Sequence, residues 1–407
     1  MNDDVRRSLP HLADQYVDQL VSFCQRLVQT PSLPGEEGDV AELIHAEMES
    51  LGYDDVWVDD WGNVVGLLKG QGTGASVMFN GHMDHVDPGD PKDWPYLPYS
   101  GEIHDGRLWG RGVADMKGPL AAMIYAGGVM AGEGIRPPGD LYVAGVVQEE
   151  VGGLGTQKLV QTVRPDLAVV GEATSNQLAR GHRGRIELVV KARGKSVHAS
   201  VPRQGVNPHA VLVRFIRRLE SIPMRDDDTF GASTVAPTLY QTDQRSSNVV
   251  PGEARVHLDW RNVPGEAPSD VMGQLGPLLQ ECVAEVQGSQ GELSVHTRDL
   301  RTYTGRTESF PAVFASYGLD SSHPLVQKGQ QVLTDALSRP VEVMIWDFAT
   351  DGGHLVQAGV PTIGFGPAEA DKLHTVGESV PLDMLAEGLL GYVALALELG
   401  AVDTSSV

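Results

Sequence analysis

"SVMFNGHMDHVDPGD", residues 76–90, joins a short apolar run to a turn crowded with acids and imidazoles. From His82 to Asp90 the turn holds two histidines and three aspartates, and it has no lysine or arginine. A short apolar run between polar segments is typical of a buried strand. The segment therefore predicts a buried strand whose end presents chemically active side chains.

The same order of elements recurs along the chain. Helices are expected between several of the apolar runs, notably at 120–130 and 156–163. Near-continuous apolar strands that alternate with helices indicate an α/β fold with a mainly parallel sheet. The strands are expected at 63–68, 76–79, 140–147, 167–170, 341–348 and 361–366.

The middle of the chain has a different pattern. Residues 183–302 read as strand, helix, strand, strand, helix and strand, which is the ferredoxin-like order. The sequence therefore predicts a main domain made of residues 1–182 and 303–407, interrupted by an inserted ferredoxin-like α+β domain at 183–302. The segment 301–318 fits neither pattern and is predicted to be a loop over the site.

The composition limits the classes of binding partner. The chain has 407 residues, more than one hydrophobic core usually serves, and a net charge of −23. Such acidity argues against a nucleic-acid or anionic membrane surface and favours a cationic partner such as a metal ion. Two cysteines are too few for a disulfide framework or a thiolate metal site. Residues 1–16 have no apolar signal core, and no apolar run approaches the roughly 20 residues of a membrane helix. We expect a cytoplasmic protein.

Polar turns follow several of the predicted strands. Because parallel strands end at one edge of a sheet, these turns are expected to converge there. Two imidazoles and several carboxylates without a thiolate suit zinc or another divalent ion, and one carboxylate can bridge two ions. The residues concerned are His82, Asp84, Asp115, Glu149, Glu150, Glu172 and His374.

Each of these residues also has an ordinary structural interpretation. Asp115 precedes a predicted helix and can act as its N-cap. Glu172 is an acid of the kind favoured in the first turn of a helix, and Asp84 is a common turn former. Only their joint occurrence at successive strand ends favours a metal site.

The ordered motifs carry a more specific signal. Together they resemble the co-catalytic zinc metallohydrolases typified by acetylornithine deacetylase, succinyl-diaminopimelate desuccinylase, aminoacylase and glutamate carboxypeptidase. The resemblance covers nearly the whole chain, including the inserted domain. The motifs are GHMD (81–84), GRGVADMKG (110–118), QEE (148–150), GEAT (171–174), SVHAS (196–200), DWRNVPG (259–265) and LHTVGES (373–379).

The resemblance implies two divalent ions per chain, with zinc favoured and cobalt or manganese as alternatives. One ion would be held by His82, Asp115 and Glu172, and the other by Asp115, Glu150 and His374. Asp84 would orient His82, and Glu149 would be the general base. A cis peptide is implied between Asp115 and Met116.

The resemblance also assigns roles outside the metal ligands. The inserted domain would be a lid and the interface of a homodimer, and its His198 would donate to the oxyanion, often across subunits. Arg261 and Asn248 would grip a substrate carboxylate, and Gly352 and Gly353 would lie in a substrate-side loop.

Several polar residues match no ligand of the pattern. His85, Asp87 and Asp90 are interpreted as rim or turn residues. His104, His182 and His354 have no assigned role, although His354 follows the substrate-side loop.

The implied activity is metal-dependent hydrolysis of the amide bond of an N-acyl amino acid by an activated water. The QEE and GHRGR segments look closest to the deacetylase and desuccinylase branch. A dipeptidase or carboxypeptidase with the same site is the first alternative. A non-catalytic interaction module that kept the fold is the alternative from another class, and loss of a ligand or of the base would indicate it; none is missing.

Overall fold

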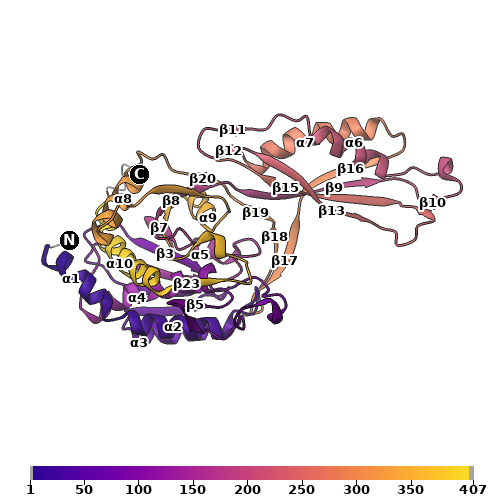
Figure 1. Cartoon of the computed structure of the whole chain (residues 1–407). Coiled ribbons are helices and arrows are strands. Elements are labelled where there is room, and N and C mark those ends of the chain that lie inside the picture. The colour runs from indigo at the N-terminus through magenta and orange to yellow at the C-terminus, as the bar shows by residue number, and fades with distance from the viewer. Residues whose placement is uncertain (1–2, 403–407) are drawn as a thin grey trace. The chain divides into compact units, whose positions relative to one another are not determined.

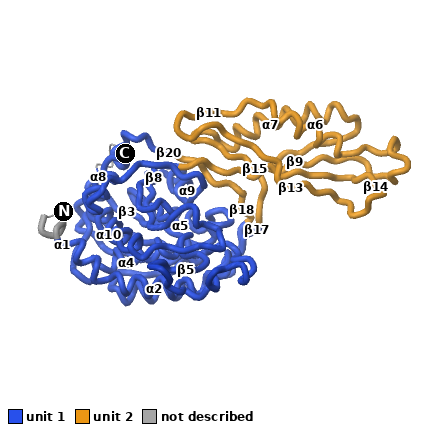
Figure 2. Tube along the Cα trace, in the orientation of Figure 1, with its two compact units in different colours: residues 1–181, 299–308, 318–407 blue, residues 182–298, 309–317 orange. Residues whose placement is uncertain are grey.

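The computed structural model describes residues 3–402, which fall into two compact units (Figure 2). Of the described residues, 3–181, 299–308 and 318–402 belong to unit 1, and 182–298 and 309–317 belong to unit 2. Each unit has its own core of buried apolar side chains. Cys24 in unit 1 and Cys282 in unit 2 are buried free thiols.

Unit 1 combines a large sheet with helices (Figure 1). Its helices are α1 (Asp3–Asp14), α2 (Val17–Gln29), α3 (Gly38–Ser50), α4 (Gly118–Gly132), α5 (Leu154–Leu159), α8 (Pro324–Leu337), α9 (Gly352–Gln357) and α10 (Leu382–Glu398), with the short turns η1 (Pro91–Asp93), η2 (Val113–Lys117), η4 (Ala370–Lys372) and η5 (Leu399–Ala401). The large sheet contains β1 (Asp55–Val58), β2 (Val64–Leu68), β3 (Val77–His82), β6 (Leu141–Val146), β7 (Leu167–Val170), β8 (Leu178–His182), β20 (Tyr317–Gly318), β21 (Val343–Trp346) and β22 (Thr362–Gly364). A small sheet is formed by β4 (Ile103–His104), β5 (Arg107–Trp109) and β23 (Ser379–Pro381).

The α/β fold is confirmed, and the large sheet is mixed. Its strand order is β1-β2-β6-β3-β7-β22-β8-β20, with β21 paired to β8. At the centre β3 runs parallel to β6 and β7, and β22 runs parallel to β7. The flanking pairs β1–β2, β2–β6 and β22–β8 are antiparallel. A short turn joins β1 to β2, and a short turn can link only antiparallel neighbours. The parallel centre is the part that gathers strand ends at one edge.

The central strands are buried on both faces. Every residue of β3 and β7 is buried, which explains their almost unbroken apolar sequences. Tyr392 on α10 packs between the rings of Phe79 on β3 and Phe365 after β22, with ring centroids 5.2 and 5.1 Å away. These contacts tie the last helix to the strands that carry the polar turns.

Within residues 3–402, one helical stretch is long and apolar enough to cross a membrane, contrary to the expectation from the sequence. This is Leu382–Ala401, with a mean hydropathy of 1.5. In the fold 67% of that stretch is buried. Extensive burial is typical of the core helix of a globular domain, and α10 occupies that place here.

Unit 2 follows the predicted order of strands and helices. Its main elements are β9 (Arg185–Arg193), α6 (His209–Leu219), β13 (Thr234–Thr242), β15 (Glu253–Arg261), α7 (Pro268–Ala284) and β16 (Gln290–Val295). The sheet order is β13-β15-β9-β16, and all of these pairs are antiparallel. Shorter elements are β10 (Val197–His198), η3 (Pro202–Gln204), β11 (Asp226–Asp227), β12 (Gly231–Ala232), β14 (Val249–Val250) and β19 (Val313–Phe314).

The two faces of this sheet differ in chemistry. Alternate residues of β9, such as Leu188 and Val190, are buried in a core shared with α6 and α7 (Figure 1). The intervening residues, such as Glu187 and Lys191, point to the opposite face because side chains alternate along a strand. The polar face carries the second histidine cluster described below.

Residues 301–318 are not a loop, so that prediction was wrong. β17 (Thr297–Arg301) and β18 (Thr307–Pro311) form a two-stranded sheet, β19 pairs with β9, and β20 joins the large sheet. A turn at Thr302–Arg306 closes the β17–β18 pair through a hydrogen bond from Thr302 N to Arg306 O. These strands are short and polar, so their hydrophobic pattern was too weak to reveal them.

Candidate metal centre

The parallel centre of the sheet brings four of the predicted residues to one edge. His82 is the last residue of β3, Glu149 and Glu150 follow β6, and Glu172 follows β7. β3 lies between β6 and β7 and runs parallel to both. Their ends therefore meet, as the strand pattern predicted.

Two further residues reach the same place from turns. Asp115 lies in η2, and His374 lies between η4 and β23. His82 Nε2 is 2.9 Å from Asp115 Oδ1 and 3.4 Å from Glu172 Oε1. His374 Nε2 is 3.0 Å from Asp115 Oδ2 and 3.2 Å from Glu150 Oε1. Asp115 thus presents one oxygen to each imidazole, and all five predicted ligands lie together.

Glu149 lies in the same cluster. A carboxylate oxygen of Glu149 and ligand atoms of His82 and Glu172 lie within 4.8 Å of one another. By distance alone, Glu149 is placed to act as a metal ligand as well as a general base. Burial raises the pKa of Glu149 well above its ordinary value, and the nearby carboxylate of Asp351 adds to this although His82 opposes it.

Asp84 holds this turn in a way that the sequence did not predict. The ring Nδ1 of His82 is 2.9 Å from the backbone oxygen of Asp84, while the nearer carboxylate oxygen is 3.6 Å away. The carboxylate instead accepts hydrogen bonds from the backbone N–H groups of Glu149 and Glu150, both at 3.1 Å. Asp84 therefore orients His82 through its carbonyl and the Glu149–Glu150 turn through its side chain.

The turn that carries Asp115 is fixed by residues missed in the sequence. The Asp115–Met116 peptide is cis, as the resemblance implied. Glu378 Oε1 accepts from the backbone N–H groups of Ala114 and Asp115 at 2.9 and 3.2 Å. Its other oxygen pairs with Arg111 at 2.6 Å. Glu378 lies four residues after His374, and its place in the LHTVGES motif was the one signal in the sequence.

Lys117 connects the same turn to the end of α2. Its side chain is fully buried and donates to the carbonyl oxygens of Leu27 and Thr30 at 3.0 and 2.7 Å. Leu27 lies in the last turn of α2, and Thr30 is the residue directly after that helix. Lys117 thereby joins η2 to the end of α2.

The charges of the cluster fit a divalent cation. Burial raises the pKa of Glu172 to about 7, and the neighbouring Asp115 contributes. Hydrogen bonds that the imidazole donates to Asp115 and then to Glu150 raise the pKa of His374 to about 10. Burial opposes charge on His82, but its contacts with Asp115 and Glu172 outweigh this and raise its pKa well above the ordinary value. The site therefore attracts positive charge, and its nitrogen and oxygen donors suit zinc, cobalt or manganese.

The predicted residues of unit 2 lie in two places: His198 and Asn248 lie before the start of β15, and Arg261 lies at its other end. His198 is exposed, and its Nδ1 is 2.8 Å from Ser200 Oγ. The backbone N–H of Ala199 donates to Asn248 O at 2.8 Å, so His198 and Asn248 lie on paired segments. Arg261 ends β15 and donates from Nε to Asp259 Oδ1 at 2.7 Å.

Gly352 and Gly353, expected in a substrate-side loop, are buried at the start of α9. The following His354 is also buried, with Nε2 3.0 Å from Gly152 O. Gly153 has a φ of +77°, and a Cβ there would lie 2.5 Å from Asp351 Oδ1. This segment therefore packs closely behind the Glu149–Glu150 turn.

The unassigned polar residues have structural contacts. His85 lies in the turn after β3 but is buried, so it is not a rim residue, and it accepts from the backbone N–H of Ser32 at 3.0 Å. Asp87 and Asp90 accept from Gly89 N and Lys92 N and are turn residues, as predicted. His104 stacks on Tyr96, and His182 is buried against Tyr317.

Comparisons with known proteins agree with this architecture. Residues 78–398 match Peptidase family M20/M25/M40. Escherichia coli (strain K12) "Uncharacterized protein YgeY" is 29% identical over 391 residues, covering 95% of both chains. Succinyl-diaminopimelate desuccinylase of Cereibacter sphaeroides (strain KD131) is 34% identical over 256 residues, covering 59% of this chain and 67% of the relative. Among solved structures, the Bacillus subtilis YXEP protein, a dinuclear metal-binding peptidase, has a TM-score of 0.71 at 15% identity, covering 96% of this chain and all of that one.

Proposed function

The chain belongs to Peptidase family M20/M25/M40 and is a metallohydrolase of amide or peptide bonds, and from this premise we propose that it removes the acyl group from an N-acyl amino acid. The observation that carries the proposal is the position of Asp115, whose two oxygens face the imidazoles of His82 and His374. One carboxylate shared in this way is the arrangement of two-metal hydrolytic sites.

The five ligands divide into two sets that share Asp115. His82, Asp115 and Glu172 would hold one divalent ion, and Asp115, Glu150 and His374 the other, with zinc favoured and cobalt or manganese as alternatives. Ions bound there would polarise the scissile carbonyl and lower the pKa of the attacking water.

Glu149 is assigned the proton transfer. It takes a proton from the water whose oxygen attacks the amide carbon, and it returns a proton to the nitrogen as the C–N bond breaks. The products are a carboxylic acid and a free amine. The upward shift in the pKa of Glu149 is the direction that a proton shuttle near neutral pH needs. Asp84 fixes the backbone of Glu149 and so aims this carboxylate.

Residues of unit 2 are proposed to bind the substrate. His198 would donate a hydrogen bond to the oxyanion. Arg261 would grip the substrate carboxylate, and its side chain, 35% exposed, keeps donors accessible despite its bond to Asp259. Asn248 lies near the opposite end of β15, so it would contact that carboxylate from the partner chain of a dimer. Gly352 and Gly353 would help shape the substrate pocket from behind the Glu149 turn. The likeness to a desuccinylase supports an N-acyl amino acid. The likeness to a peptidase keeps a dipeptide or a peptide C-terminus as the alternative substrate.

We also propose that the protein is a cytoplasmic homodimer that associates through unit 2, which acts as a lid. β13 is the edge strand of its sheet, and its Leu239 and Tyr240 are 47% and 41% exposed. An exposed edge strand with apolar side chains is suited to pairing with a second chain. Sedimentation analysis and cell fractionation test these two statements.

The activity is tested on protein reconstituted with zinc, cobalt or manganese. A panel of N-acetyl, N-succinyl and N-formyl amino acids is compared with matched dipeptides, and release of the free amine is measured. The proposal expects the highest kcat/KM on an acylated amino acid. Higher values on dipeptides would favour the alternative, and no hydrolysis together with no metal uptake would overturn both.

A further inference from the structure

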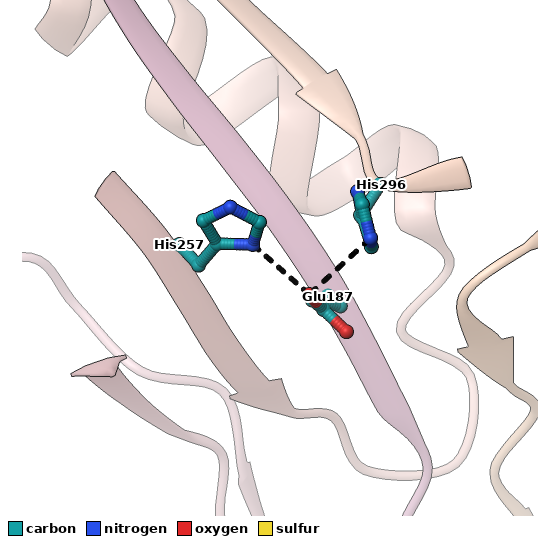
Figure 3. Close-up of side chains that lie close together, drawn as sticks. All are labelled: Glu187, His257 and His296. Carbon is teal, nitrogen blue, oxygen red and sulfur yellow. Dashed lines mark hydrogen bonds and ion pairs between the residues drawn. The ribbon is translucent and has the colours of Figure 1, made fainter. Parts of the chain in front are cut away.

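A second group of metal-ligating side chains lies on the polar face of the sheet in unit 2. It consists of Glu187 on β9, His257 on β15 and His296 directly after β16 (Figure 3). His257 pairs with Val189, so it lies one diagonal step from Glu187. His296 donates from its backbone N–H to Glu187 O, so it lies opposite Glu187. The register of three adjacent strands therefore places these side chains on one face.

The side chains converge on a single oxygen. His257 Nδ1 is 3.0 Å from Glu187 Oε1, and His296 Nε2 is 3.8 Å from the same atom. All three ligand atoms lie within 4.8 Å of one another. Zinc bonds of about 2.0–2.2 Å would place neighbouring donors roughly 3.3–3.6 Å apart, so small side-chain rotations would close the site.

Hydrogen bonding alone does not account for this arrangement. Glu187 already accepts from Arg298 at 2.6 Å through its other oxygen, Oε2. The 3.8 Å separation of His296 from Oε1 is too long for a hydrogen bond, yet its ring nitrogen faces that oxygen (Figure 3). Two imidazoles aimed at one carboxylate oxygen form the donor set of a borderline divalent ion.

The surroundings allow an ion to enter and bind. The side chains of Glu187 and His257 are 12% and 11% exposed, and that of His296 is 30% exposed. The guanidinium of Arg298 beside Glu187 opposes a cation, so affinity should be modest.

We infer that Glu187 Oε1, His257 Nδ1 and His296 Nε2 form a third metal site that binds one zinc or similar divalent transition ion. None of these three residues belongs to the strand-end centre, which is the group of proposed ligands His82, Asp115, Glu150, Glu172 and His374. Three protein ligands leave a fourth position for water or an exogenous ligand. The inference depends on unit 2 alone and not on the activity proposed for unit 1.

The test counts ions bound to the full-length protein. Metal-free protein is dialysed against buffered free zinc, and zinc per chain is measured for the parent, Glu187→Gln, His257→Ala and His296→Ala. Each variant should bind one ion fewer than the parent at saturation. His209→Ala, a histidine of unit 2 that stacks on Tyr240 instead, is the matched control and should bind the parent number.

Two further measurements keep the result unambiguous. The same one-ion difference should persist when His82→Ala and His374→Ala are added, because those ligands belong to the other centre. Arg298→Ala should tighten the third ion roughly tenfold by removing a nearby positive charge, and a folding defect would not produce this gain. Equal zinc content in the parent and all three ligand variants would overturn the inference and leave a network of ion pairs.

Discussion

The two clusters of histidine and carboxylate in this chain reach their geometry by different routes. In unit 1 the ligands come from the ends of parallel strands and from turns, so residues distant in sequence meet at one edge. In unit 2 they come from the middle and flank of antiparallel strands, and pairing register alone sets them on one face. Strand ends place side chains on turns that other side chains must hold in place, whereas a sheet face places them on paired backbone.

The two clusters also differ in charge. In unit 1 the carboxylates of Glu149 and Glu172 are buried beside His82, and burial raises the pKa of both. The nearby cation Arg111 is already paired with Glu378. In unit 2, Arg298 neutralises Glu187 directly. The first cluster therefore requires cations for charge balance, and the second does not. We expect tight ions at the first and a weaker ion at the second.

The largest expected effect separates the two clusters by chemistry. Glu149→Gln keeps the side-chain volume but cannot take a proton, so kcat should fall by about two to four decades. Zinc at the strand-end centre should stay bound, because the five assigned ligands are intact. The matched variant Glu187→Gln should show the opposite result: it should bind one ion fewer than the parent. Parental activity in Glu149→Gln would show that the base is another residue.

The next effect concerns the contribution of unit 2 to catalysis. His198→Ala should lower kcat by about 10²–10³ if this imidazole donates to the oxyanion. The exposed His11→Ala is the control and should keep the parental kcat. A rise in KM with kcat unchanged would assign His198 to substrate binding instead.

Mixing Glu149→Gln with His198→Ala chains tests whether His198 acts across subunits. If it does, each heterodimer has one site with both defects and one complete site, so activity should reappear on subunit exchange. Exchange shown by labelled subunits without recovered activity would place His198 in its own chain's site or outside catalysis.

A smaller effect is expected from metal removal. Ions that bind only the folded chain stabilise it by about 2.7 kcal/mol per site at a free concentration of 100 Kd. Chelation should therefore lower the denaturation midpoint of the parent. The drop should be smaller in His82→Ala, which has lost a strand-end ligand, and nearly parental in His296→Ala at low free zinc. Drops that are smaller than the parent's by the same amount in both variants would mean that the two centres do not differ in affinity.

The contrast also explains what the sequence could predict. The strand ends were foreseeable because apolar strands precede His82, Glu149 and Glu172, and parallel strands must end together. The motifs then indicated Asp115 and His374, whose turns have no such regularity. The roles of Glu378 and Lys117 were missed because hydrogen bonds to backbone groups leave no pattern in the sequence.

The cluster of unit 2 was beyond such reasoning. Glu187, His257 and His296 lie on strands far apart in the chain, and a shift of one residue in register would move any of them to the buried face. That register is set by the apolar partners under α6 and α7 and not by the polar residues themselves. The alternation of apolar and polar residues predicts a strand, but it does not predict which residues of two neighbouring strands pair with each other.

The smallest effect sharpens the comparison by adding His354, a buried histidine whose pKa is lowered instead of raised. His354 is fully buried, with Nε2 3.0 Å from Gly152 O, and burial lowers its pKa to about 4. In the unfolded chain a histidine has a pKa of about 6.5, so the unfolded state binds the proton more readily and stability is lost as pH falls below about 6.5. Between pH 8 and pH 5 this amounts to about 2 kcal/mol. His354→Gln should therefore lose about 2 kcal/mol less than the parent over that range, measured by urea denaturation in chelator so that the metal centres do not contribute. The exposed His11→Gln is the control and should follow the parent. An unchanged pH dependence in His354→Gln would show that the folded protein accommodates the protonated imidazole, and His354 would then belong with His82 and His374 as a residue held in a site that attracts positive charge.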